Sequence, residues 1–193
     1  MRRKRGECRR SGCARFPSAV SAERRTLLRS SVALFALSAI GPFAERASGR
    51  ALAIGAAAPP ATLITLDGQH ISTVDLRGRV VILTFWATYC LPCRDELPLL
   101  SRFASEHSEA VSVLGFCLDE SREIGEVRRI ANSLSFPVGF MREDSAPGYG
   151  RIWRLPANFT IGRDGLLVDD RWRQKNSAWT AEALQHVIVP LLG

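Results

Sequence analysis

The chain has 193 residues, of which 46% are hydrophobic and 23% are charged, a composition typical of a globular protein rather than a disordered one. Its net charge of +7 is unevenly placed: residues 1–53 contain 12 of the 26 basic and three of the 19 acidic side chains and carry +9, so residues 54–193 carry −2. A nucleic-acid-binding domain needs its basic surface on the folded body, so this distribution excludes nucleic acid as the expected partner.

Residues 1–53 are predicted to form an export leader ahead of a single folded domain at 54–193. The pair Arg24–Arg25 precedes the uncharged stretch 30–44, and residues 51–53 have the A-x-A pattern that a signal peptidase needs. The arginine pair resembles a twin-arginine export signal, and an ordinary secretory signal fits equally well. The uncharged stretch is shorter than the roughly 18–20 residues that span a bilayer, although an uncleaved anchor remains an alternative.

The folded part is predicted to alternate between strands and helices. The expected elements, in chain order, are strands at 61–66 and 69–72 joined by a turn at 67–68, a strand at 79–86, a helix at 92–107, a strand at 110–118, a helix at 121–134, a helical turn at 149–154, strands at 157–161 and 166–172 joined by a turn at 163–165, and a helix at 180–192. This order predicts an α/β fold with a central mixed sheet, helices on both faces and an extra N-terminal hairpin.

The cysteines are too few and too close together for a structural disulfide framework. Cys8 and Cys13 fall in the predicted leader, which leaves Cys90, Cys93 and Cys117 in the folded part. One close pair and one remaining cysteine indicate redox chemistry. Because Cys117 lies within an apolar strand, we expect it to behave as a small buried hydrophobic residue, with a third redox thiol as the alternative.

The pair Cys90 and Cys93 lies where a buried strand ends and a helix begins. Helix N-termini present free amide hydrogens and the positive end of the backbone dipole, which favour a thiolate. In such a motif the pKa of a cysteine falls from about 8.5 into a range of about 3.5–7.5. Pro92 suits an early helical position because it has no amide hydrogen. We expect Cys90 to be the exposed, attacking thiol and Cys93 to resolve the mixed disulfide.

A metal site is the main structural alternative for this pair. Structural zinc usually needs a second pair of ligands, and the three histidines, His70, His107 and His186, are scattered without ligand spacing. We therefore expect no bound metal or other cofactor. A Cu(I)-handling module stays open, because two thiolates are enough to hold Cu(I).

Residues 85–98 (FWATYCLPCRDELP) resemble the active-site segment of the TlpA/ResA-like branch of the thioredoxin family. The resemblance extends over residues 54–193 and includes the segments at 55–59, 76–79 and 155–159. It implies a thioredoxin-like three-layer fold and a periplasmic thiol-disulfide oxidoreductase, with a membrane tether as an alternative to a free exported protein. Members of this branch reduce disulfides of client proteins, including those of cytochrome c maturation, and a membrane electron-donor protein of the thiol-relay type reduces them again.

The resemblance also implies roles for three further residues. Pro156 matches the cis-proline that faces the disulfide and exposes backbone for pairing with an extended client. Glu96 matches an acid used near the buried thiol, and its alternative is a solvated glutamate that favours the helix N-terminus. Trp86 matches a tryptophan packed beside the motif, and its alternative is an ordinary core aromatic.

The sequence departs from a typical thioredoxin in ways that bear on these roles. Thr84 replaces a buried aspartate that accepts a proton, which makes Glu96 the better candidate base. Tyr89 replaces the usual tryptophan, and the apolar Leu91 lies between the cysteines. A peroxiredoxin is a further alternative for the fold, but it needs a threonine where this chain has Ala87. A strongly oxidising protein would share the same motif, because only the redox potential separates the two directions.

Overall fold

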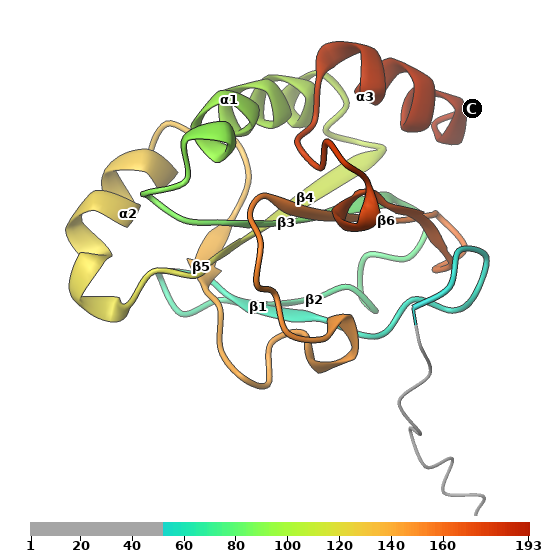
Figure 1. Ribbon diagram of the computed structural model, residues 1–193. Helices are drawn as coiled ribbons and strands as arrows, with labels where there is room; N and C mark the ends of the chain where they lie inside the picture. Colours follow the sequence, from blue (N-terminus) through green and yellow to red (C-terminus); the bar gives the residue numbers. More distant parts are fainter. Residues whose placement is uncertain (1–51) are drawn as a thin grey trace, which may run out of the picture. The chain divides into compact units, whose positions relative to one another are not determined.

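The computed structural model describes residues 52–193, so residues 1–51 of the predicted leader at 1–53, with Cys8 and Cys13, lie outside the described residues. The described part contains a five-stranded mixed sheet in the order β5-β4-β3-β6-β7 and a separate hairpin, β1-β2 (Figure 1). The strands are β1 Thr62–Ile64, β2 His70–Ser72, β3 Val80–Trp86, β4 Val111–Cys117, β5 Val138–Phe140, β6 Ala157–Ile161 and β7 Leu167–Asp170.

The central strand β3 fixes the position of the active-site motif. All seven of its residues are buried, as a strand covered on both faces requires. It pairs in parallel with β4 and antiparallel with β6, and Thr84 lies opposite Gly115 on one side and Asn158 on the other. Residues of three strands therefore lie side by side at the level of Thr84, two residues before β3 ends, and Thr84 and Asn158 provide the polar side chains.

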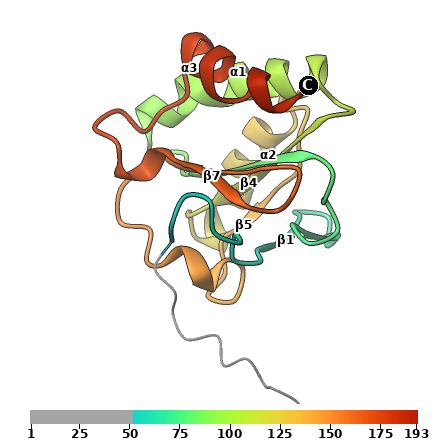
Figure 2. The ribbon, with the colours of Figure 1, turned by 90° about the vertical axis from the view of Figure 1, so that its right-hand side faces the viewer.

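The α-helices are α1 (Leu91–Glu106), α2 (Ile124–Ala131) and α3 (Ala181–Val187). Their apolar side chains, among them Leu100, Val127 and Leu184, pack into one core cluster with one face of the sheet. Figures 1 and 2 show α1 and α3 above the sheet and the hairpin β1-β2 below it. The predicted thioredoxin-like α/β fold with an extra N-terminal hairpin is therefore confirmed.

The sequence predicted helices on both faces of the sheet, and the face opposite α1, α2 and α3 differs from this prediction. Opposite the α-helices, the sheet is covered by the hairpin and by a 3-10 turn, η2 (Pro147–Tyr149), rather than by an α-helix. Both connections β3-α1-β4 and β4-α2-β5 advance across the sheet in the same direction, so right-handed crossovers place both helices on the same face. Among residues 52–193, no helix combines the length and the apolar character that a membrane span requires.

Several local predictions were wrong in detail. The helical turn expected at 149–154 lies earlier in the chain, as η2, and the helix expected at 180–192 is divided into α3 and a 3-10 turn, η4 (Val189–Leu191). Strand β5 was not predicted; it pairs in parallel with β4 at the edge of the sheet. The predicted helix at 121–134 is divided into a 3-10 turn, η1 (Ser121–Glu123), and the shorter α2. These changes leave β3, α1 and the motif where the sequence places them.

Gly139 in β5 allows the hairpin to approach the sheet. A Cβ atom at this position would overlap the backbone carbonyl of Ile64 in β1, which no side-chain movement can relieve. We expect Gly139→Ala to lower the free energy of unfolding by about 1–3 kcal/mol or more, measured by urea denaturation. The matched control is Gly125→Ala in α2, where the added methyl meets open space and should be neutral or slightly stabilising. Equal stability of the two variants would contradict this packing.

Candidate active site

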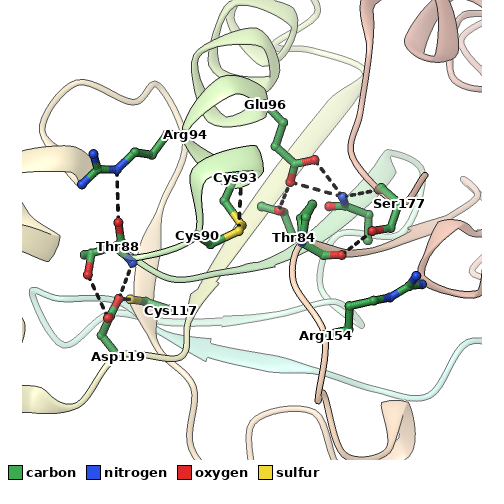
Figure 3. The surroundings of a disulfide bond; sticks show 12 residues. Thr84, Thr88, Cys90, Cys93, Arg94, Glu96, Cys117, Asp119, Arg154 and Ser177 are labelled. Carbon is green, nitrogen blue, oxygen red and sulfur yellow. Dashed lines mark hydrogen bonds between the residues drawn. A yellow bond between two sulfur atoms is a disulfide. The ribbon is translucent and has the colours of Figure 1, made fainter. Parts of the chain in front are cut away.

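Cys90 and Cys93 form a disulfide at the N-terminus of α1 (Figure 3). Cys90 is the N-cap residue in an extended conformation, its Sγ accepts a hydrogen bond from the Cys93 amide at 3.3 Å, and Pro92 lies in the first turn. Cys90 is 7% exposed and Cys93 is fully buried. Of the two sulfurs, solvent and partner molecules therefore reach that of Cys90 first.

The segment before the motif is held by an acid at the end of β4. Asp119 accepts hydrogen bonds from the Thr88 amide at 2.7 Å and from the Thr88 hydroxyl at 2.9 Å. Arg94 donates to the Thr88 carbonyl at 3.1 Å and lies 3.9 Å from Glu126 of α2. Both polar groups of the Thr88 backbone are thus fixed, which sets the position of Cys90. Sequence reasoning missed this contact, because a single acid after a strand has no distinguishing pattern.

Cys117 is a buried free thiol outside the disulfide. It donates to Asp119 at 3.1 Å, and burial raises its pKa far above that of a free cysteine. The thiolate is the reactive form of cysteine, so this environment makes Cys117 inert. The structure confirms that Cys117 is buried, as expected, and adds the hydrogen bond to Asp119, which the sequence did not indicate.

Glu96 is the most completely bonded polar side chain near the motif. It is 1% exposed, one helical turn after Cys93, and its carboxylate accepts hydrogen bonds from three residues on other elements. The donors are the Thr84 hydroxyl at 3.0 Å, the Asn158 amide at 3.0 and 3.2 Å, and the Trp179 backbone N–H at 2.8 Å. The alternative of a solvated first-turn glutamate is therefore wrong.

Burial raises the pKa of Glu96 to about 7. The hydrogen bonds from Trp179, Thr84 and Asn158 oppose this rise because they favour the ionised form, and the charge of Arg171 opposes it too. The Arg171 guanidinium lies 4.4 Å from the Trp179 ring centroid, and this contact holds the cation beside the residue whose backbone N–H donates to Glu96. A carboxyl group with a pKa near neutral exchanges protons readily at physiological pH.

The other two predicted site residues lie on neighbouring strands. The peptide bond Leu155–Pro156 is cis, as the resemblance implies, and it lies directly before β6. The Pro156 carbonyl accepts a hydrogen bond from the buried Ser177 hydroxyl at 2.7 Å. Trp86 ends β3 and is fully buried in the same core cluster as both motif cysteines. Sequence reasoning missed Ser177 altogether, because one buried serine in a loop has no distinguishing pattern.

A buried strand that leads into a Cys-x-x-Cys disulfide at a helix N-terminus, on this sheet order, defines a thiol-disulfide oxidoreductase with a thioredoxin-like fold. The sequence profile of the AhpC/TSA family matches residues 54–169, and the chain belongs to that family.

Individual relatives agree with this class. The thiol-disulfide oxidoreductase ResA of Bacillus thuringiensis is 33% identical over 119 residues, which cover 60% of this chain and 68% of ResA. ResA of Geobacillus thermodenitrificans is 29% identical over 152 residues, or 75% of this chain and 86% of that protein. A crystal structure from Chlorobium tepidum, described as a candidate thiol:disulfide interchange protein DsbE, superposes with a TM-score of 0.60 at 26% identity and covers 74% of this chain and 99% of that one. The resemblance to the ResA-like branch is confirmed.

The raised pKa of Glu96 makes the stability of the folded protein depend on pH. Between the ordinary pKa of 4.5 and about 7, the unfolded chain ionises Glu96 while the folded protein keeps it protonated. The free energy of unfolding therefore falls as pH rises through this window, by about 3 kcal/mol in total. Glu96→Gln is neutral at every pH, so we expect urea denaturation between pH 4 and 8 to show a correspondingly flatter profile.

The matched control for this prediction is Glu106→Gln, which changes an exposed glutamate at the other end of α1. Its profile should follow that of the unaltered protein. An unchanged slope in Glu96→Gln would mean that Glu96 ionises in the folded protein as it does in the unfolded chain.

Proposed function

We propose that this protein is an exported reductase of disulfide bonds in client proteins. The observation that carries the proposal is the arrangement of the disulfide: an accessible Cys90, a fully buried Cys93 and, one turn further along α1, the buried carboxyl of Glu96. Tyr89 and Leu91 flank Cys90 and are 73% and 70% exposed. Two large apolar side chains in solvent beside the reactive sulfur offer a surface for a partially unfolded client.

In the proposed reaction the reduced protein transfers two electrons to the client. The Cys90 thiolate attacks one sulfur of the client disulfide, and the other client sulfur leaves and takes up a proton. Cys93 then loses its proton to Glu96 and attacks the Cys90 sulfur, which releases the second client thiol and closes the Cys90–Cys93 disulfide. A membrane electron-donor protein with its own dithiol reduces this disulfide again, because an oxidising compartment offers no thiol pool.

The environment of Cys90 favours reduction of clients over oxidation. Strong stabilisation of the thiolate makes a dithiol a strong oxidant. Within the described part of the chain, the Cys93 amide is the one hydrogen-bond donor to the Cys90 sulfur, and Pro92 has no amide hydrogen to add. The Arg94 guanidinium is turned toward the Thr88 carbonyl instead (Figure 3). The thiolate is therefore only moderately stabilised.

Export to the periplasm is proposed from the leader, whose arginine pair and uncharged stretch lie outside the described residues and whose A-x-A pattern at 51–53 follows them. The ResA-like resemblance makes cysteine pairs of cytochrome c precursors one class of client. The peroxidase alternative receives no support from the geometry. Ala87 is buried and has no hydroxyl, and the Thr88 hydroxyl is bound to Asp119.

The reduction potential of the Cys90–Cys93 pair decides the direction of the reaction. We expect equilibration with a dithiol buffer to give a value near that of thioredoxin, about −270 mV, because the Cys90 thiolate has few donors. A potential near about −120 mV, typical of a strong oxidant, would refute the reductase role. Titration of the reduced protein with Cu(I) alongside this measurement tests the copper-handling alternative.

Trapping identifies the clients directly. Cys93→Ala removes the resolving thiol, so we expect Cys90 to remain covalently attached to client proteins in cells, as mixed disulfides that a reducing agent releases. The double variant with Cys90→Ser is the control and should trap nothing. If Cys93→Ala captures no protein, Cys90 does not attack client disulfides.

A further inference from the structure

The hydrogen bonds around Glu96 continue beyond its own donors. The Asn158 amide nitrogen, which donates to the Glu96 carboxylate, also donates to the Ser177 carbonyl at 2.9 Å. Both hydrogens of this amide are therefore engaged, one at each acceptor. Because the Ser177 carbonyl accepts one of them, the Asn158 amide is oriented with its nitrogen, not its oxygen, toward the carboxylate.

Ser177 makes a second contact with the opposite end of the site. Its hydroxyl donates to the Pro156 carbonyl at 2.7 Å. The backbone carbonyl and the side chain of this one buried residue thus bond to two different groups, the Asn158 amide that donates to Glu96 and the carbonyl of the cis-proline. The chain of contacts runs from the carboxylate through Asn158 and Ser177 to Pro156.

We propose that Ser177 is a positioning residue that links the buried carboxyl group of Glu96 to the backbone of the cis-Pro156 segment. The inference rests on the proposed function, in which Glu96 accepts a proton from Cys93, and on the pairing of an extended client with the Pro156 segment that the family resemblance implies. Through this link, a client that displaces the Pro156 backbone shifts Ser177 and weakens or strengthens the hydrogen bonds that Asn158 donates to the Glu96 carboxylate. By the reciprocity of binding equilibria, the proton on Glu96 then affects the affinity for the client.

The other groups that face Glu96 do not provide such a link. Thr84 and Trp179 donate directly to the carboxylate, and within residues 52–193 neither side chain forms a hydrogen bond with Pro156. Arg171 is the cation that acts on Glu96, and Cys93, one turn back on α1, is the titratable group on the same helix. Loss of the Ser177 hydroxyl leaves all four of these in place.

The experiment follows the pH dependence of disulfide exchange between the reduced full-length protein and a synthetic peptide that contains one disulfide. Glu96→Gln first assigns the inflection that belongs to Glu96. In Ser177→Ala we expect this inflection to move up by about 0.5–1 pH unit. Without its bond to Pro156, residue 177 is held less firmly, and so is the backbone carbonyl that orients the Asn158 amide. The amide then stabilises the Glu96 carboxylate less. We also expect KM for the peptide to rise, because the Pro156 carbonyl loses its hydrogen bond.

Two matched variants separate positioning from general structural support. Thr84→Val removes a direct donor to Glu96, so it should move the inflection and leave KM unchanged. Ser145→Ala removes another buried serine hydroxyl, which accepts from the Arg142 amide away from this network, and it should change neither quantity. The inference is overturned if Ser177→Ala folds and its inflection stays at the native pH.

A measurement on the unaltered protein covers the case in which Ser177→Ala does not fold. The pH profile of kcat/KM reports the free protein, and that of kcat reports the complex with the peptide. The link requires the Glu96 inflection to differ between the two profiles, and coincident inflections overturn it. If Glu96→Gln removes no inflection from either profile, the proposed proton-accepting role of Glu96 fails instead, which is a separate result.

Discussion

The burial of one carboxyl group beneath the disulfide constrains the rest of the site. Removal of an ionised carboxylate from water costs several kcal/mol unless hydrogen bonds replace its hydration. Glu96 meets this requirement with donors from β3, from β6 and from the segment before α3. These elements must therefore come together around the first turns of α1, and the same contacts that make the charge tolerable hold the motif in place.

A second set of contacts holds the motif from its outer side. Asp119 and Arg94 fix Thr88, so the chain enters α1 between two anchors, one just after β4 and one in the first turn of α1. A reactive group is held more precisely by strands and helices than by a free loop. The accessible Cys90 thus lies on a rigid support, while the exposed side chains on either side of it remain free to contact a client.

The sequence was informative where a pattern extends over neighbouring residues. The apolar run of β3, the spacing of Cys90 and Cys93 and the start of α1 follow from local chemistry, and the structure agrees with all three. Strand β5 escaped prediction because it is only three residues long and follows Pro137, too short for any periodicity. Asn158 and Ser177 were missed for another reason. They are neutral residues 62 and 81 positions from Glu96, and only the folded sheet brings them to it.

The position of Glu96 explains why this chain has Thr84 where a typical thioredoxin has an aspartate. The Thr84 hydroxyl lies 3.0 Å from the Glu96 carboxylate, in a site from which water is excluded. An aspartate on β3 at this position would place a second carboxyl beside the first, and two carboxylates so close cannot both be ionised. A neutral hydroxyl donates to Glu96 instead. The ionisable group is thereby carried by α1, the helix that also carries Cys93, so the thiol and the proposed proton acceptor keep the same spacing even if the helix shifts against the sheet.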